Sequence, residues 1–313
     1  LVTLRHIACS CWCHKYQLHT DWTGIRVLKL RLITGTIMFV LLLFVSFKPS
    51  PYTGLGLFLV TALLSLRANR EYFDLCGKAG LPGFCAISKI ASLLMLGLAV
   101  LQARYDVSSL ETAVIASTVL AVLVKGMRHD DHATGIRNAM VTLGGFLFFG
   151  WCLAFTMKIY FFSAAGVGPI LLFFFLLVTK ASDMGGYFFG KVTSTREGGN
   201  HKLVPRLSPG KSWEGLVGSL IFSGGLGGYL AFAFAETLTV NGIAIVTPLT
   251  GVIAGFSLAL IGLAGDLVES VIKRAADTKD SGAIAPGMGG VYDVVDSVIF
   301  AAPLFYAWAS RVL

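Results

Sequence analysis

Long apolar segments alternate with short polar connections along most of the 313 residues. Most of these segments approach the roughly 20 residues that an α-helix needs to cross a bilayer, although the second is short enough for a tilted or re-entrant helix. The pattern predicts an all-α fold, a polytopic transmembrane bundle of about nine helices. The expected spans lie near residues 28–47, 52–66, 86–103, 108–124, 140–160, 164–182, 214–235, 246–265 and 291–310.

The composition supports a membrane protein. Hydrophobic residues make up 55% of the chain and charged residues only 13%, whereas charged residues form about 25% of an ordinary soluble domain. The charges are confined to the connections between apolar segments, which excludes a soluble α/β protein. The net charge of +8 fits basic loops at anionic headgroups better than nucleic-acid binding, because no basic patch with interleaved aromatic residues is present.

The basic residues also predict the orientation of the bundle. Lys and Arg accumulate in the cytoplasmic connections of membrane proteins. If the N-terminus lies inside, the opposite side keeps few of the 25 basic residues, namely Lys48, Arg104, Lys158 and Arg311. The sequence therefore predicts a cytoplasmic N-terminus and an extracytoplasmic C-terminus.

Three regions are expected along the chain. They are a polar N-terminal extension (1–24), a set of N-terminal spans (25–182) and a C-terminal transmembrane region (183–313) with cytoplasmic loops at 183–213 and 266–290. Glycine is frequent inside the spans, as in the segment 224–228. A dinucleotide-binding loop would need a preceding strand, so these glycines indicate close packing between helices.

The most informative polar residues lie in the last third of the chain. Residues 264–277 are expected to form a helix that continues out of the eighth span, and at roughly 100° per residue one stripe of this helix is polar. The stripe comprises Asp266, Ser270, Lys273 and Asp277, with Glu269 at its edge. A solvated helix end with internal ion pairs is the simpler alternative. We favour a functional site, because ionisable groups at the end of an apolar span usually face a cavity or a partner.

A second group of candidates opens the last span. Asp293 and Asp296 are three residues apart and share one helical face, with Ser297 beside them. Gly289 and Gly290 precede them, and glycines before a helix allow the backbone to approach a phosphate. Together with Asp266, the two carboxylates predict a Mg²⁺ site, since Mg²⁺ takes oxygen ligands. Helix capping is the alternative for Asp293, but it does not explain an acid one turn further along.

The segment 202–215 adds several cations between Pro and Gly turns. Lys202, Arg206 and Lys211, with Ser208 between them, suit a polyanion such as a triphosphate or a lipid phosphate. A basic cytoplasmic loop without a ligand is the alternative.

These segments together resemble the phosphatidate cytidylyltransferases, also called CDP-diacylglycerol synthases. The resemblance covers about residues 180–300 and depends on long, gapped agreement, whereas the first half agrees only in its apolar spans. The matching residues are Asp183 with Tyr187; Ser208, Pro209, Lys211 and Trp213–Gly215; Gly265–Leu267, Glu269 and Ser270; Lys273, Arg274, Lys279, Asp280 and Gly282; and Pro286, Gly289, Gly290, Asp293, Asp296 and Ser297. The chain departs from the pattern at Ala285, Met288 and Val294, where the family usually has a bulky apolar residue, His and Arg.

The resemblance implies a nucleotidyltransferase that converts CTP and phosphatidate to CDP-diacylglycerol and pyrophosphate in phospholipid biosynthesis. It implies Mg²⁺, alone or with a monovalent cation, held directly by Asp266 and Asp293 with Asp296 and Asp183 in support. The implied catalytic residues are Asp266, Lys273, Arg274, Lys279, Asp293 and Asp296. The implied substrate-binding residues are Lys202, Arg206, Ser208, Lys211, Ser270, Gly289 and Gly290.

The same resemblance places the chain in membrane lipid, in the bacterial inner membrane, as a multi-pass protein whose active site faces the cytoplasm. A homodimer is a further expectation, and a nucleic-acid partner is not expected. Three alternatives stay open. They are a non-catalytic membrane paralogue that has lost the family His and Arg, a CTP-dependent enzyme acting on another lipid phosphate, and a transporter. The clustering of charges on one side of the bundle disfavours the transporter.

Overall fold

The computed structural model of the protein describes residues 43, 47, 51–103, 105–162, 166–195, 199–282 and 289–311. Nine α-helices form most of this described part, and a π-helix, η1 (Leu147–Cys152), joins two of them into one continuous helical segment. The α-helices are α2 (Pro51–Lys78), α3 (Cys85–Leu101), α4 (Ser108–Met127), α5 (His132–Phe146), α6 (Leu153–Tyr160), α7 (Val167–Ser194), α8 (Trp213–Ala233), α9 (Pro248–Ala275) and α10 (Tyr292–Ala309).

Two short antiparallel hairpins complete the described structure. The first pairs β1 (Lys202–Val204) with β2 (Ser208–Ser212) directly before α8, and the second pairs β3 (Thr239–Val240) with β4 (Ile243–Ala244) between α8 and α9. Neither hairpin joins a larger sheet in the described residues. The predicted all-α class is therefore confirmed.

Several helices are long and apolar enough to cross a membrane. Within the described ranges there are five, at 108–127, 132–160, 167–194, 213–233 and 248–275. A membrane-embedded helical bundle is thus supported by length and composition together. Most of the predicted first span, and all of the predicted extension 1–24, lie outside the described residues.

The helices extend further into the polar segments than the hydropathy pattern predicts. Helix α7 continues to Ser194 and α9 to Ala275, so much of the expected loops 183–213 and 266–290 is helical. Helix α2 likewise runs to Lys78, well past the predicted span 52–66. The reason is that apolar side chains mark the part of a helix inside the bilayer, whereas backbone hydrogen bonds continue regardless of polarity. Asp183 therefore lies on a helix and not in a loop.

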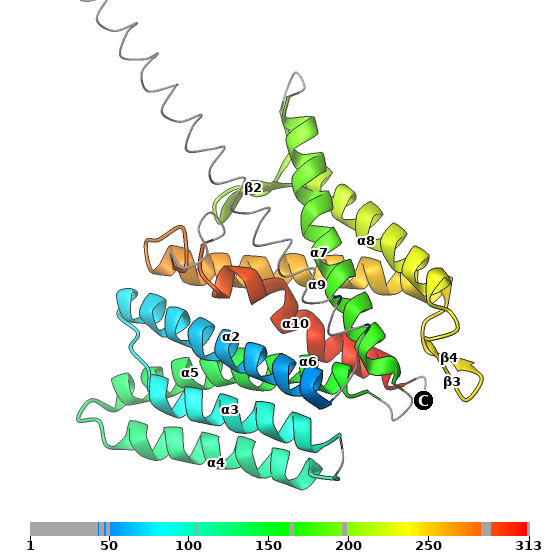
Figure 1. Cartoon of the computed structure of the whole chain (residues 1–313). Helices are drawn as coiled ribbons and strands as arrows, with labels where there is room; N and C mark the ends of the chain where they lie inside the picture. The colour runs from blue at the N-terminus through cyan, green and yellow to red at the C-terminus, as the bar shows by residue number, and fades with distance from the viewer. Residues whose placement is uncertain are drawn as a thin grey trace, which may run out of the picture.

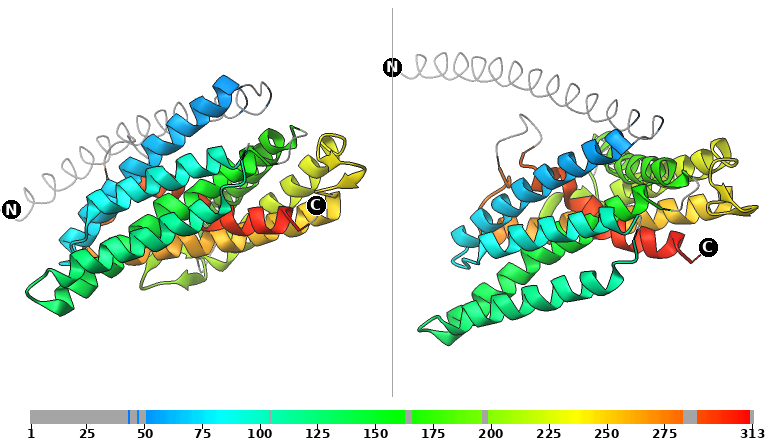
Figure 2. Two further views of the ribbon diagram at one scale, coloured as in Figure 1. Left: turned by 90° about the horizontal axis from the view of Figure 1, so that it is seen from below. Right: turned by 60° about the horizontal axis from the view of Figure 1, so that its bottom comes forward.

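Helix α10 lies at the centre of the bundle (Figures 1 and 2). Helices α2 to α6 lie on one side of it and α7 to α9 on the other, and α10 contacts members of both groups. Aromatic packing contributes to this placement, since the rings of Phe175 and Phe305 stack with centroids 5.1 Å apart. The helix that carries Asp293 and Asp296 therefore contacts both groups of helices.

Glycines allow α8 to approach its neighbours closely. A Cβ atom added at Gly227 would collide with the carbonyl oxygen of Gly251 on α9, and one added at Gly218 would collide with that of Gly185 on α7. Such contacts are typical of membrane helices that pack through small residues. Within the segment 224–228, the glycines Gly224, Gly227 and Gly228 pack closely against α9, whereas Gly225 does not.

Substitution of Gly227 by alanine is expected to destabilise the bundle by about 1–3 kcal/mol, because the added methyl group has no space against α9. Gly225 supplies a matched control, since a Cβ atom there meets no heavy atom within 4 Å. Both changes raise helix propensity equally. Thermal unfolding in detergent should show a lower midpoint for Gly227→Ala alone; equal midpoints would contradict the packing account.

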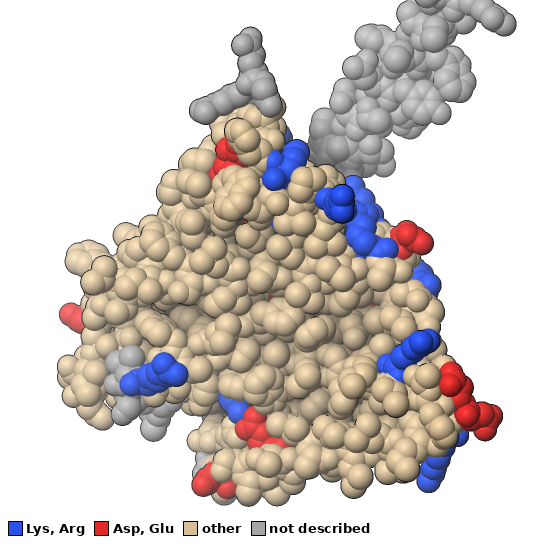
Figure 3. Space-filling view, turned by 180° about the vertical axis from the view of Figure 1, so that it is seen from behind, with Lys and Arg blue, Asp and Glu red and all other residues tan. Residues whose placement is uncertain are grey.

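On one face of the molecule, charged side chains lie mainly toward the edges. On the face opposite to Figure 1, Lys, Arg, Asp and Glu gather along the rim and the middle is largely uncharged (Figure 3). An uncharged middle between charged ends is what a bundle surrounded by hydrocarbon requires.

Candidate active site

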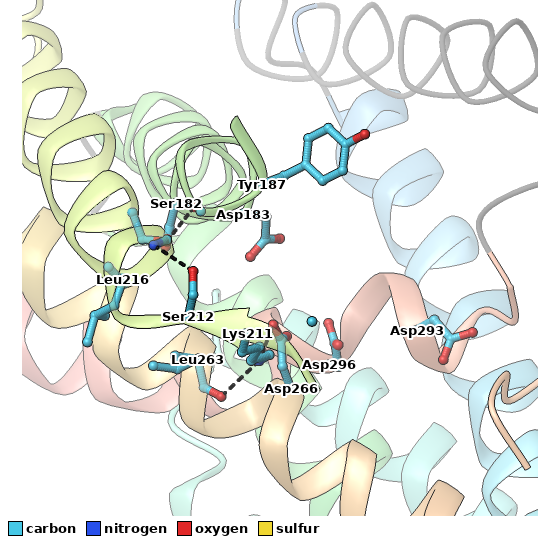
Figure 4. A pocket seen from close by; sticks show the side chains of 15 residues that line it. Ser182, Asp183, Tyr187, Lys211, Ser212, Leu216, Leu263, Asp266, Asp293 and Asp296 are labelled. Carbon is cyan, nitrogen blue, oxygen red and sulfur yellow. Dashed lines mark hydrogen bonds and ion pairs between the residues drawn. The ribbon is translucent and has the colours of Figure 1, made fainter. Parts of the chain in front are cut away.

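A cavity of about 310 Å³ opens between α7, the β2–α8 junction, α9 and α10 (Figure 4). Its lining includes four carboxylates from three helices and one ammonium group. They are Asp183 from α7, Asp266 from α9, Asp293 and Asp296 from α10, and Lys211 from β2. Hydroxyl groups of Ser182, Ser212, Ser219 and Tyr187 also line it. The cavity thus combines fixed charge with polar groups at the ends of apolar helices.

Asp266 and Asp296 lie side by side at the wall of this cavity (Figure 4). Their carboxyl groups lie within hydrogen-bonding reach of each other, and Asp183 interacts electrostatically with Asp266. Two carboxylates this close repel unless a proton or a cation lies between them. Asp296 is buried, with 7% of its surface exposed, and its Oδ1 atom accepts a hydrogen bond from the Ser297 backbone N–H at 2.6 Å.

This arrangement fits a divalent cation whose remaining ligands come from a substrate. In the part of the chain that the structure describes, no three His, Cys, Asp or Glu side chains are grouped closely enough to hold a metal by themselves. Mg²⁺ does not require such a cage, because it commonly takes one or two carboxylates together with phosphate oxygens and water. The all-oxygen pair of Asp266 and Asp296 supplies that kind of partial site.

The β1–β2 hairpin is fixed to α9 at two points. The Lys211 Nζ atom lies 2.8 Å from Asp266 Oδ2 and 3.4 Å from the carbonyl oxygen of Leu263. Arg274 donates from Nε to the carbonyl oxygen of Leu207 at 3.3 Å. The hairpin therefore covers the end of α9 and orients the Asp266 carboxylate toward the cavity.

Asp293 belongs to a second cluster beside the first. Lys273 bridges two carboxylates, with Nζ 3.0 Å from Asp293 Oδ1 and 2.9 Å from Glu269 Oε2. The other Asp293 oxygen accepts hydrogen bonds from the backbone N–H groups of Gly290 at 2.7 Å and Ser281 at 3.4 Å. Asp293 lines the cavity, but its carboxylate also holds the chain that leads into α10.

Gly289 has the backbone conformation that this connection needs. Its φ of +88° belongs to the left-handed region, and a Cβ atom there would collide with Asp293 Oδ2. A glycine is therefore required for the close approach between backbone and carboxylate.

The structure sorts the predicted site residues into groups. It brings together Asp183, Asp266, Asp296 and Lys211 in one cluster, and Lys273 with Asp293 in the other. The cations on the surface, outside these clusters, are Lys202, Arg206, Arg274 and Lys279, while Ser208 and Ser270 are half-buried. The Asp266 carboxylate thus contacts Asp296, whereas Asp293 contacts Lys273. The prediction that Asp266 and Asp293 are the direct metal ligands stays a prediction. Of the departures from the family pattern, Ala285 and Met288 lie outside the described residues.

Sequence reasoning missed two buried or partly buried charges, Lys180 and Glu71. Lys180 precedes Asp183 by three residues on α7, and an ionisable group at the end of the predicted span 164–182 was a usable signal. Glu71 lies beyond the predicted end of the second span, so it was treated as part of a connection. Glu71 was missed because α2 extends to Lys78, beyond the predicted end of the span.

Glu71 connects α2 to the start of α10. Its side chain is 2% exposed, and its Oε2 atom accepts hydrogen bonds from the Tyr292 backbone N–H at 2.9 Å and the Ser281 hydroxyl at 3.3 Å. Arg67 lies one turn earlier, with Nε 3.3 Å from Glu71 Oε1. Through Tyr292 this carboxylate positions the helix that carries Asp293 and Asp296.

Replacement of Glu71 by alanine is expected to loosen the start of α10. It leaves the Tyr292 N–H and the Ser281 hydroxyl buried without their acceptor, at a cost of about 1–3 kcal/mol for each group. Amide hydrogen exchange in a peptide containing Tyr292 should become faster. Asp74→Ala is the control, because Asp74 lies on the same helix with 64% of its side chain exposed; equal exchange in the two variants would contradict the role of Glu71.

The fold and the cavity define a helical protein suited to a membrane, in which paired carboxylates and lysines meet at the ends of apolar helices. The cytidylyltransferase family matches residues 29–311. The chain belongs to that family.

Among individual relatives, two carry the name phosphatidate cytidylyltransferase. The phosphatidate cytidylyltransferase of Bacillus subtilis is 28% identical over 288 residues, which is 89% of this chain and 96% of the relative. The enzyme of the same name from Haemophilus influenzae is 42% identical over 139 residues. The uncharacterized protein YnbB of Escherichia coli is 36% identical, also over 139 residues. The last two alignments cover 44% of this chain and only 45% and 42% of those relatives, so the chain aligns with less than half of their length.

Proposed function

We propose that the protein transfers the cytidylyl group of CTP to phosphatidate and so forms CDP-diacylglycerol and pyrophosphate. The observation that carries the proposal is the adjacent pair Asp266 and Asp296, flanked by Lys211, in a cavity at the ends of apolar helices. Such a site offers charge for a triphosphate while the surrounding helices offer a path for acyl chains. Membership in the cytidylyltransferase family supports the same reaction.

In this reaction a phosphatidate phosphate oxygen attacks the α-phosphorus of CTP. A new P–O bond forms there, the bond from the α-phosphorus to the oxygen bridging to the β-phosphorus breaks, and pyrophosphate leaves with that electron pair. The attacking phosphate is already anionic, so the protein needs no nucleophile or strong base. Catalysis consists of positioning the two anions and neutralising the charge that develops on them.

The protein's own residues divide these tasks between them. Asp266 and Asp296 would hold Mg²⁺, which supplies charge neutralisation and orientation for the triphosphate. Lys211 keeps the Asp266 carboxylate turned to the cavity. The exposed cations Lys202, Arg206 and Lys279 would contact phosphates. Gly289 and Gly290, which were expected beside a phosphate, instead make room for the carboxylates of Asp293 and Glu71 at the start of α10.

We further propose that the bundle has nine spans in the bacterial inner membrane, with the N-terminus and the active site on the cytoplasmic side. The end of α9, the start of α10 and the α4–α5 connection gather at one end of the molecule, and the C-terminus lies at the other (Figure 1). The end with the site is also the one where the sequence concentrates Lys and Arg, which supports a cytoplasmic position. CTP can reach a site there directly from the cytosol.

The proposal is tested by offering the detergent-purified protein CTP, Mg²⁺ and phosphatidate, and by identifying the lipid product from its mass. CDP-diacylglycerol is expected from the wild-type protein and not from Asp266→Asn. Parallel reactions with other lipid phosphates, such as an isoprenoid glycerol phosphate, establish the substrate class. A folded protein that forms no cytidylyl lipid from any of them would contradict the proposal and support a non-catalytic paralogue.

A further inference from the structure

Lys180 lies beside the carboxylates of the cavity, although it was not among the expected site residues. Its Nζ atom is 3.1 Å from Asp183 Oδ2, 3.1 Å from the carbonyl oxygen of Val294 and 3.0 Å from the Ser297 hydroxyl. An ammonium group has three donors, and these three acceptors account for all of them. Lys180 is therefore fixed in place and joins α7 to the first turns of α10.

The charge of Lys180 acts on the whole carboxylate cluster. Besides its ion pair with Asp183, it interacts electrostatically with Asp296 and Asp266. Lys211 contributes a second ammonium group through its pair with Asp266. Three carboxylates and two ammonium groups leave a formal charge of −1, whereas the same cluster without Lys180 would carry −2.

We propose that Lys180 is a positioning residue whose fixed positive charge limits how tightly the Asp266–Asp296 pair binds a divalent cation. The inference deepens the proposed function, because it depends on the metal site described there. A fixed charge a few ångströms from a divalent ion repels it strongly in a partly desolvated site. Moderate metal affinity suits a site in which the metal also binds the triphosphate and must release pyrophosphate.

This proposal and a purely structural role of Lys180 predict opposite changes in metal affinity when the lysine is replaced. If Lys180 only joined α7 to α10, its loss would loosen the site and weaken metal binding. If its charge opposes the metal, loss of the charge strengthens binding although two hydrogen bonds to α10 are lost. The Lys180→Met variant separates these cases, and Lys180→Arg keeps the charge.

The experiment measures Mn²⁺ binding to the full-length, detergent-purified protein without substrate, from the electron paramagnetic resonance signal of free Mn²⁺. Lys180→Met is expected to bind Mn²⁺ about tenfold or more tightly than the wild-type protein, and Lys180→Arg about as tightly as wild type. Lys191→Met is the matched control, since Lys191 is exposed and lies about three helical turns further along α7. Thermal unfolding of each variant confirms that it is folded.

Unchanged or weaker Mn²⁺ binding by Lys180→Met, with Lys191→Met unchanged, would overturn this inference and leave the metal site in place. The absence of Mn²⁺ binding in the wild-type protein and every variant would instead overturn the metal site of the proposed function, and this inference with it.

Discussion

Replacement of Asp266 by asparagine is expected to reduce CDP-diacylglycerol formation by about a thousandfold or more, while the bundle stays folded. Asp266 is the carboxylate that lies beside Asp296 and is oriented by Lys211 at 2.8 Å. Metal-assisted charge stabilisation contributes several kcal/mol to such reactions, and each 1.36 kcal/mol corresponds to a tenfold change in rate. Asparagine has the same size but no charge for the metal. Initial rates at saturating CTP and phosphatidate measure the effect.

Asp277→Asn supplies the matched control for this variant. Asp277 falls on the same predicted stripe as Asp266, but it lies beyond the end of α9, is exposed and has a φ of +51°. Asparagine tolerates this left-handed conformation well. Asp277→Asn is expected to keep nearly full activity. Comparable losses of activity in Asp266→Asn and Asp277→Asn would mean that negative charge anywhere along this face of the helix matters for the reaction, and not the pair of Asp266 and Asp296.

Replacement of Lys273 by methionine is expected to lower the stability of the protein by about 3 kcal/mol and to abolish its activity. Lys273 bridges Glu269 and Asp293, whose side chains are only 4% and 12% exposed. Without the ammonium group two adjacent carboxylates remain in a site that is poor in water. Removal of one partner from a buried ion pair is strongly destabilising for this reason. The midpoint of thermal unfolding in detergent measures the change.

A second substitution tests whether charge is the cause. Adding Glu269→Gln to Lys273→Met removes one of the two uncompensated carboxylates and is expected to restore most of the lost stability. Activity should not return, because Asp293 still lacks the cation that positions it. A double variant as unstable as Lys273→Met would show that the packing of the lysine side chain, and not its charge, stabilises this cluster.

The class of fold was predictable because the bilayer constrains sequence so strongly. Helices that cross hydrocarbon must satisfy all their backbone groups internally and present apolar side chains. The segments predicted near 86–103, 108–124 and 291–310 agree in position with the helices α3, α4 and α10, of which α4 is long and apolar enough to cross a membrane. The ends of α2, α7 and α9 were not predictable in the same way. They project beyond the apolar segment, where helix length depends on tertiary contacts and not on hydropathy.

The types of residue in the site were also predictable, but their pairing was not. Spacing along a helix correctly placed Asp293 and Asp296 in the first turns of α10. It could not show that Asp296 lies beside Asp266 while Asp293 turns to Lys273, because that depends on how α9 and α10 pack. The contact from Glu71 to Tyr292 joins residues 221 positions apart, and no local pattern encodes it.

The fate of the individual phosphates of CTP tests the central claim most directly. The protein is incubated with phosphatidate, Mg²⁺ and CTP that carries ³²P at either the α- or the γ-position, and the label in the lipid fraction is counted. Cytidylyl transfer predicts that α-label enters the lipid in step with CDP-diacylglycerol, while γ-label appears only in pyrophosphate. Label from the γ-position in the lipid would mean phosphoryl transfer, and no label from either position would mean no transfer; both results would contradict the account.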